Sequence, residues 1–113
     1  MQRIETNGLE LDTSVRLASA LRAVAEIECV SEPGAWRLSW PEVAGAQGYE
    51  LQQTTNMIRC PWMPAATVLQ NESRLPALSA DEVWIRVRAL GVTGSGPWSD
   101  PVLMRRSLVR MAA

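Results

Sequence analysis

Histidine, lysine and phenylalanine are absent from the sequence, and its 113 residues include only two cysteines. Without imidazole, neither a Ser-His or Cys-His nucleophilic dyad nor a zinc site with histidine ligands can be built. The two cysteines, Cys29 and Cys60, stand far apart and cannot supply a cysteine-rich metal site. The sequence also lacks a glycine-rich phosphate loop. We therefore expect no enzyme, no metal and no cofactor.

An excess of charge of one sign is also missing. The formal net charge is −1, and all eleven basic residues are arginine. A nucleic acid or an anionic membrane surface attracts proteins with a clustered basic excess, so we expect neither as a partner. The acidic residues occur mostly singly or on alternating positions, as in Glu26 and Glu28. This spacing favours solvated faces over a paired catalytic acid and base.

Long hydrophobic runs are missing as well. No run approaches the roughly 20 residues that span a bilayer, and the first residues lack the apolar core of a secretory signal. We therefore expect a protein made in a cytoplasm, without a signal peptide or a transmembrane segment. Thiols there are mostly unpaired, so Cys29 and Cys60 are expected to be free and partly buried.

What is present suits one globular domain with a single core, since 47% of the residues are hydrophobic and 20% charged. Residues 1–20 are expected to form an arm or a short helix, because residues 12–27 carry apolar side chains at helical spacing. These side chains are Leu17, Ala18, Leu21, Val24 and Ala25, with Asp12 or Thr13 as the N-cap. Residues 21–104 form the predicted domain, and residues 105–113 form a tail.

From Ala25 onward the apolar residues recur with a period of two, which is typical of strands with one buried face. Ile27 and Cys29 are the inward residues of the first expected strand. The alternation is clearest in "WRLSW" (36–40), "YELQQT" (49–54) and "VWIRVRAL" (83–90). Residues 56–71 contain prolines and predict a loop with one edge strand. "ESRLPAL" (72–78) predicts a short strand near a sheet edge, and "WSDPVLM" (98–104) a last strand after a glycine turn.

Six or seven short strands separated by turns predict an all-β protein with an antiparallel sandwich rather than a parallel α/β sheet. The inward positions of these strands make up the predicted core, which comprises Trp36, Leu38, Trp40, Tyr49, Leu51, Leu78, Val83, Ile85 and Val87.

From about residue 21 to residue 104 the chain resembles a fibronectin type III domain, which is an immunoglobulin-like β-sandwich. Trp40, Tyr49, Leu78, "IRVRA" (85–89) and "GSGPWSDP" (94–101) stand where that family has its landmarks. The resemblance implies a sandwich of about seven strands. One position departs from the family. Val83 replaces the tyrosine whose hydroxyl ties a corner to the backbone, so the corner is expected to be built differently.

The outward face of residues 83–90 carries Trp84, Arg86 and Arg88, and the returning strand brings Trp98 beside them. Guanidinium groups stacked on indoles resemble the Trp and Arg ladder of the W-S-x-W-S motif in cytokine receptors, although only one W-S pair is present here. Amphipathic side chains commonly cover and stiffen an open sheet face. The alternative hypothesis is a recognition surface that uses Trp84 and Trp98.

The segment "CPWMPA" (60–65) poses the same choice. Trp62 stands there with Met57, Ile58 and Met63 in a loop that should face solvent. Large apolar groups in such a loop favour an interface, whereas many loops of this kind fold back and close the open end of a sandwich. Both interpretations stay open for Trp62.

These observations favour a non-enzymatic structural or protein-interaction module. We expect a subunit of a larger assembly, and a homo-oligomer is one form that it could take. The preferred assembly is a bacteriophage virion, in its tail, baseplate or capsid, put together inside a bacterium. The arm before Leu21 and the tail are then docking elements, with Arg105, Arg106 and Arg110 facing acidic neighbours. The alternative is an adhesion or carbohydrate-binding module that uses exposed tryptophans.

Overall fold

The computed structural model describes residues 21–76 and 81–105. The predicted arm, the predicted core residue Leu78 and the tail residues Arg106 and Arg110 lie outside these ranges. Within them, no helix is long and apolar enough to cross a membrane.

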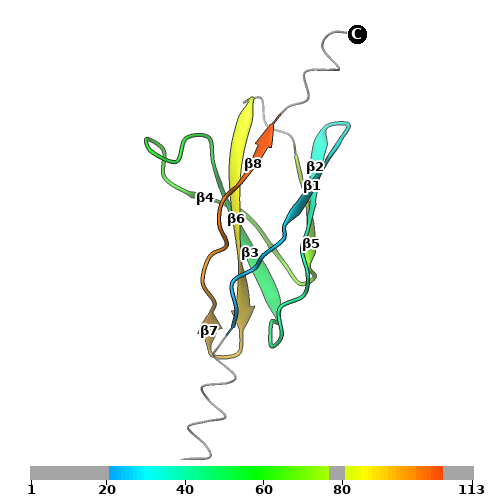
Figure 1. Ribbon diagram of the computed structural model, residues 1–113, viewed down its shortest axis with the longest axis vertical. Helices are drawn as coiled ribbons and strands as arrows, with labels where there is room; N and C mark the ends of the chain where they lie inside the picture. The colour runs from blue at the N-terminus through cyan, green and yellow to red at the C-terminus, as the bar shows by residue number, and fades with distance from the viewer. Residues whose placement is uncertain (1–20, 77–80, 106–113) are drawn as a thin grey trace, which may run out of the picture.

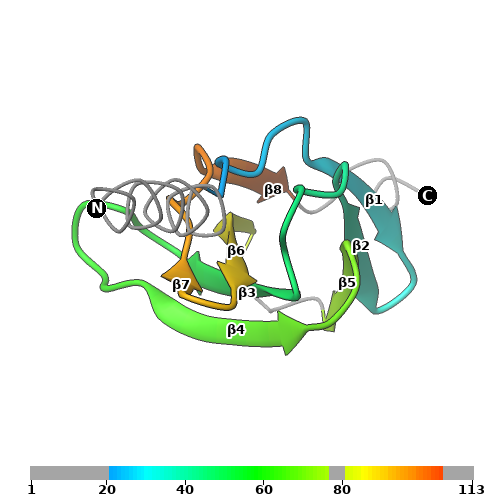
Figure 2. The same ribbon diagram turned by 90° about the horizontal axis from the view of Figure 1, so that it is seen from below.

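Two antiparallel sheets pack face to face, as Figures 1 and 2 show. The first sheet has the order β1-β2-β5, with β1 (Glu28–Glu32), β2 (Ala35–Ser39) and β5 (Glu72–Pro76). The second has the order β4-β3-β6-β7, and β8 also pairs with β6. Its strands are β3 (Gly48–Thr54), β4 (Met63–Val68), β6 (Glu82–Gly91), β7 (Gly94–Ser95) and β8 (Val102–Arg105). The all-β antiparallel sandwich that the sequence predicted is therefore confirmed.

The core lies between the sheets and is built mainly from the alternating apolar positions of β2, β3, β6 and β8, with Leu75 from β5. In β6 every second residue is fully buried, which matches the period of two in the sequence. The buried apolar residues of these four strands, with their flanking tryptophan, are Ala35, Trp36, Leu38, Trp40, Tyr49, Leu51, Val83, Ile85, Val87, Ala89 and Met104.

An aromatic pair anchors one end of the core. The rings of Trp40 and Tyr49 meet edge to face, with centroids 5.3 Å apart. The Tyr49 hydroxyl accepts a hydrogen bond from the backbone N–H of Val43 at 2.9 Å. Tyr49 thus ties the loop between β2 and β3 to the core. Val83, at the position where the sequence departs from the fibronectin type III pattern that it resembles, is completely buried as an apolar side chain.

Residues 21–27 carry no regular secondary structure, so the helical spacing of Leu21 and Val24 does not produce a helix there. Both side chains are nevertheless buried, with 7% and 3% of their surface exposed. The arm or short helix was predicted for residues 1–20, which lie outside the described residues. Over residues 21–27, burial against the sandwich and not a helix face accounts for the apolar spacing. Glu26 has a φ of 53°, which places it in the left-handed region that interrupts regular structure.

Strand β1 also departs from its predicted pattern. It forms the edge of the three-stranded sheet, and its residues are exposed except for the half-buried Glu32. Cys29 was expected to point inward and to be partly buried, but it is exposed, because neither face of β1 is covered over its first four residues. Cys60 is exposed as well, and both thiols are free.

The predicted last strand, residues 98–104, forms only over its final part as β8, and a separate short strand, β7, lies in the predicted glycine turn. Residues 92 and 93 turn the chain after β6, and the two-residue strand β7 begins at Gly94, whose φ of 143° favours glycine. Residues 96–101 then run beside β6 without strand geometry, and β8 resumes pairing at its beginning, with Val102 opposite Ile85. The interrupted stretch contains Trp98.

Candidate interaction surface

The outer face of β6 carries a row of large polar and aromatic side chains on the solvent side of the five-stranded sheet. Trp84, Arg86 and Arg88 alternate with the buried aliphatic residues of this strand and are half-buried. They are placed there by the strand period alone, so the sequence was sufficient to put all three on one face.

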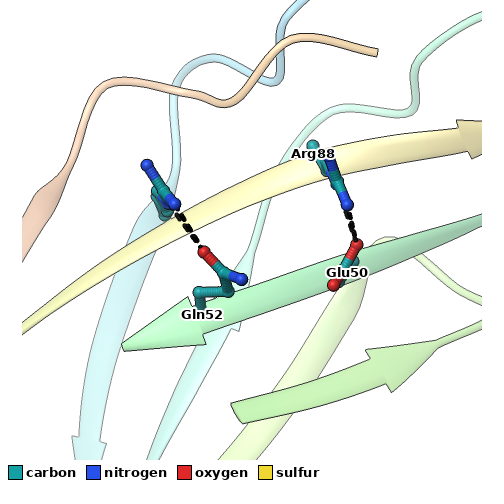
Figure 3. Close-up of polar contacts among 4 residues, drawn as sticks. Glu50, Gln52 and Arg88 are labelled. Carbon is teal, nitrogen blue, oxygen red and sulfur yellow. Dashed lines mark hydrogen bonds and ion pairs between the residues drawn. The ribbon is translucent and has the colours of Figure 1, made fainter. Parts of the chain in front are cut away.

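The neighbouring strand β3 supplies polar partners directly across the sheet. Glu50 lies opposite Arg88 and Gln52 opposite Arg86 in the strand register. Arg88 binds Glu50 through Nε at 2.8 Å and Nη2 at 2.7 Å, both to Oε1. Arg86 donates from Nε and Nη2 to Gln52 Oε1, at 3.0 and 2.6 Å. Figure 3 shows Glu50 and Gln52 reaching from β3 toward β6.

Two tryptophans from other segments stack on these guanidinium groups. The Arg86 Cζ atom lies 4.4 Å from the ring centroids of both Trp62 and Trp98. The Arg88 Cζ atom lies 4.4 Å from the Trp98 centroid. Each contact of this kind stabilises by about 0.5–1 kcal/mol at an exposed site and by more where the groups are desolvated. We call Trp62, Arg86, Trp98 and Arg88 the ladder.

The ladder differs in one member from the sequence-based expectation. Trp84 shares the outer face, but its strand neighbours are Thr54 and Leu103. Trp62 takes the second indole position instead, and it arrives from the loop before β4. The chain therefore folds Trp62 onto the outer face of the sheet and does not use it to close the open end of the sandwich.

Ser99 fixes the position of Trp98. Its backbone N–H donates to Val87 O at 2.8 Å, and its hydroxyl accepts a bond from Val87 N–H at 3.0 Å. The same hydroxyl donates to Asp100 O at 3.0 Å. Ser99 is 6% exposed. This side chain therefore replaces a strand pairing where residues 96–101 have none, and it holds the preceding tryptophan over β6.

The loop of residues 55–62 is braced internally. Asn56 Oδ1 accepts bonds from the backbone N–H groups of Ile58 and Arg59, at 2.9 and 3.0 Å. Cys60 N–H donates to Asn56 O at 2.9 Å. At the start of the loop the buried Thr54 hydroxyl accepts a bond from Asn56 N–H at 3.2 Å. The loop is thus tied at its start by Thr54 and at its end by Trp62 on the ladder.

This braced loop holds apolar side chains in solvent. Ile58 is 94% exposed, and Met57 and Met63 are 43% and 53% exposed. Several large apolar side chains exposed within one short segment favour a contact site for another molecule. We call the loop of residues 55–62 together with Met63 and the ladder the loop–ladder surface.

The electrostatics of the ladder centre on Arg86. Desolvation lowers the pKa of its guanidinium, the positive charge of Arg88 lowers this pKa further, and Glu50 opposes the change. Burial between two indoles disfavours the charged form because it removes water from the guanidinium. Arg86 is therefore a partly desolvated cation whose direct hydrogen-bond partner is a neutral amide.

A hollow of about 670 Å³ lies beside the edge strands β4 and β5. Arg37 and Arg74 line it, and Glu32 binds both, at 3.0 and 2.9 Å. Because one carboxylate already holds these two cations, the hollow offers a weaker case for a charged ligand than the ladder does.

Of the remaining predicted contact residues, Arg106 and Arg110 lie outside the described residues. Arg105 is exposed and pairs with Glu82 of this chain at 2.9 Å. Sequence reasoning did not identify Glu50, Gln52 and Ser99 as members of the site. The alternation placed Glu50 and Gln52 outward, but only the strand register shows that they meet Arg88 and Arg86.

No protein-family model matches the sequence, and no curated protein matches it. Solved structures do match. FN3tt is 20% identical, with a TM-score of 0.64 and coverage of 76% of this chain and 95% of that chain. An Fn3-like protein from Clostridium thermocellum is 16% identical, with a TM-score of 0.64 and coverage of 78% and 93%. A fibronectin type III domain from human KIAA0970 protein is 12% identical, with a TM-score of 0.67 and coverage of 83% and 80%. The chain has the fibronectin type III fold.

Proposed function

We propose that this domain is a non-enzymatic protein-interaction module and that the loop–ladder surface is its contact site. The observation that carries the proposal is Ile58, which is 94% exposed at the tip of a loop braced by Asn56. A free chain gains nothing by ordering an isoleucine in water, whereas a partner that covers this side chain gains its full burial.

The composition of the surface supports a protein partner. Tryptophan, methionine and arginine are enriched in protein interfaces, and Trp and Arg dominate their energetics. The hydrogen bonds of Asn56 and the stacking of Trp62 hold the loop in place before a partner arrives. Such preorganisation increases affinity because less conformational freedom is lost on binding.

The geometry favours a carbohydrate-binding alternative less. A sugar stacks on a free face of an indole ring, and arginines already take part of this ring surface, because Arg86 stacks on Trp62 and both Arg86 and Arg88 stack on Trp98. Trp84 is half-buried beside β8. The ladder therefore supports a role for the rings in holding the surface together, with the apolar loop as the contact.

We extend the proposal to a larger assembly in which the partner is another subunit or a second copy of this chain. A bacteriophage virion was the assembly expected from the sequence, and it belongs to this proposal on that basis alone. The solved structures named above share the fold and give no support to a virion.

A photo-reactive amino acid placed at position 58 tests the contact site in the cells that make the protein. Val92, at the tip of the hairpin after β6 and 73% exposed, provides the matched control position. We expect a specific adduct from position 58 and none from position 92, and we expect Ile58→Asp to abolish copurification of the same partner. Mass spectrometry of the adduct identifies another protein or a second copy of the chain.

Adducts of equal yield from both positions, or none from position 58, would contradict the proposal. Copurification that survives Ile58→Asp would place the contact elsewhere on the domain.

A further inference from the structure

The outer face of β6 carries three charged residues, and each has a partner across the sheet. Glu82 pairs with Arg105 on β8, and Arg88 pairs with Glu50 on β3. Arg86 occupies the same kind of position, but the residue opposite it is Gln52. Two of the three cross-strand pairs are therefore ion pairs, and the central one lacks its negative charge.

Glu50, whose carboxylate lies opposite Arg88 in the register, does not neutralise Arg86 and Arg88 equally. Glu50 Oε1 receives both Nε and Nη2 of Arg88. The ladder and its two β3 partners thus hold two positive charges and one negative charge, and the uncompensated charge lies at the residue that two indoles enclose. Partly desolvated charges are stabilised strongly by a charge of opposite sign, because little water screens the interaction.

Arg86 also retains hydrogen-bonding capacity. A guanidinium has five N–H groups, and within the described chain Arg86 uses Nε and Nη2 toward Gln52. Its planar donors match a carboxylate in a two-bond geometry, and the stacked rings of Trp62 and Trp98 hold the plane fixed. The ladder therefore presents an oriented donor group that a carboxylate fits.

We propose that the loop–ladder surface binds an acidic segment of its protein partner, with an Asp or Glu carboxylate of that segment pairing with Arg86. This inference rests on the proposed function and names the chemistry of the partner. The apolar loop around Ile58 then contacts the partner's apolar residues, and Arg86 selects a segment that places a carboxylate beside them.

The test uses a hexaglutamate peptide as the probe and the whole protein labelled with ¹⁵N. Binding is followed through the side-chain Nε–H resonance of Arg86, assigned with the Arg86→Gln variant. Gln52→Glu supplies the missing charge from within the chain at nearly unchanged volume. Gln70→Glu adds the same charge at an exposed loop position and serves as the matched control.

We expect hexaglutamate to shift the Arg86 resonance, and we expect Gln52→Glu to weaken its binding by about tenfold or more, in the range seen for close charge pairs at interfaces. Gln70→Glu should weaken it by less than about twofold, because solvent screens a distant charge. Near-ultraviolet circular dichroism checks that Gln52→Glu keeps the indole stacking. If Gln52→Glu loses the stacking, the comparison is made with Arg86→Gln. Because this variant has no Arg86 resonance, its expected loss of hexaglutamate binding is followed through the indole N–H resonances of Trp62 and Trp98.

Equal binding of hexaglutamate to the Gln52→Glu and Gln70→Glu variants would overturn the inference. So would a shift confined to other arginines, or an equal shift of the Arg86 resonance by inorganic phosphate or a single-stranded oligonucleotide. These results are separable from failure of the proposed function. A specific adduct at position 58 with no effect of Gln52→Glu would contradict only the proposal of an acidic partner. Hexaglutamate binding without any adduct would contradict the proposed contact site.

Discussion

Leu21 shows how one side chain determines what its neighbours can be. An added Cβ at Gly96 would lie 2.9 Å from Leu21 Cβ, and one at Gly91 would lie 3.0 Å from Leu21 Cδ1. Gly91 is the last residue of β6 and Gly96 comes directly after β7, so both belong to the same hairpin. The first contact is with an atom fixed to the backbone and the second with the end of a flexible side chain, so the two positions should tolerate a methyl group differently.

We predict that Gly96→Ala lowers the free energy of unfolding by about 1–3 kcal/mol, as expected for an overpacked site. Gly91→Ala should cost much less, because Leu21 Cδ1 can rotate away and because alanine restricts the unfolded chain, which stabilises by about 0.4–1 kcal/mol. Urea unfolding of both variants measures the difference. Equal costs, or a larger cost at Gly91, would show that Leu21 does not occupy this position.

The position of the Trp62 ring could not be predicted from the residues near it in the sequence. The residues around it, in a loop rich in proline and methionine, allow an interface or a closing contact equally well. Its stacking partner, Arg86, lies on a different strand. The position of the ring depends on the pairing of β3 with both β4 and β6, and periodicity carries no information on that pairing.

Among the elements, β2, β3 and β6 were predictable because each is flanked on both sides by other strands and alternates one buried and one outer face. Strand β1 was predicted as a strand, but its expected inward residue Cys29 is exposed, and the apolar Val30 is 55% exposed. The irregular stretch 21–27 was not predictable. Its apolar spacing fits a helix, but Leu21 and Val24 are buried against the sandwich from a chain without helical geometry.

The connection between β7 and β8 depends on Ser99, and we predict that Ser99→Ala loosens this whole segment. Without the hydroxyl, the backbone N–H of Val87 loses its partner in a buried position. An unpaired buried donor costs about 1–3 kcal/mol. We expect a lower free energy of unfolding. We also expect a weaker near-ultraviolet circular dichroism signal, because the ring of Trp98 becomes less fixed when the segment around Ser99 loosens.

Ser95→Ala is the control for this prediction, since Ser95 is an exposed serine of the same hairpin. It should leave both readouts unchanged within about 0.5 kcal/mol, as is usual for surface substitutions. If Ser99→Ala keeps the full tryptophan signal, the backbone contact of residue 99 is sufficient to hold the ladder and the hydroxyl is dispensable.

In the whole molecule, carboxylates clamp strands together on the outer faces of both sheets. Glu32 on β1 binds Arg37 on β2 and Arg74 on β5, and so connects all three strands of the first sheet. The described ion pairs of the second sheet join Glu50 to Arg88 and Glu82 to Arg105. Histidine is absent, so no imidazole titrates between pH 5 and 8. The pH dependence of stability should therefore come mainly from carboxylates whose pKa changes on folding, of which Glu32 is one.

We predict that the domain loses stability in acid and that Glu32 contributes to the loss. The hydrogen bond from Arg74 and the charges of Arg37 and Arg74 hold the pKa of Glu32 below its ordinary value of 4.5. A carboxyl whose pKa is lower in the folded state stabilises the fold above the unfolded-state pKa, and this contribution disappears as the pH falls through the folded-state pKa. Wild type should therefore be more stable than Glu32→Gln at pH 6, and the two should converge in urea unfolding as the pH approaches 3.

Glu28→Gln, on the same strand and exposed, should change stability less at pH 6. A difference between wild type and Glu32→Gln that stays constant from pH 6 to pH 3 would show that the clamp does not depend on the charge of Glu32.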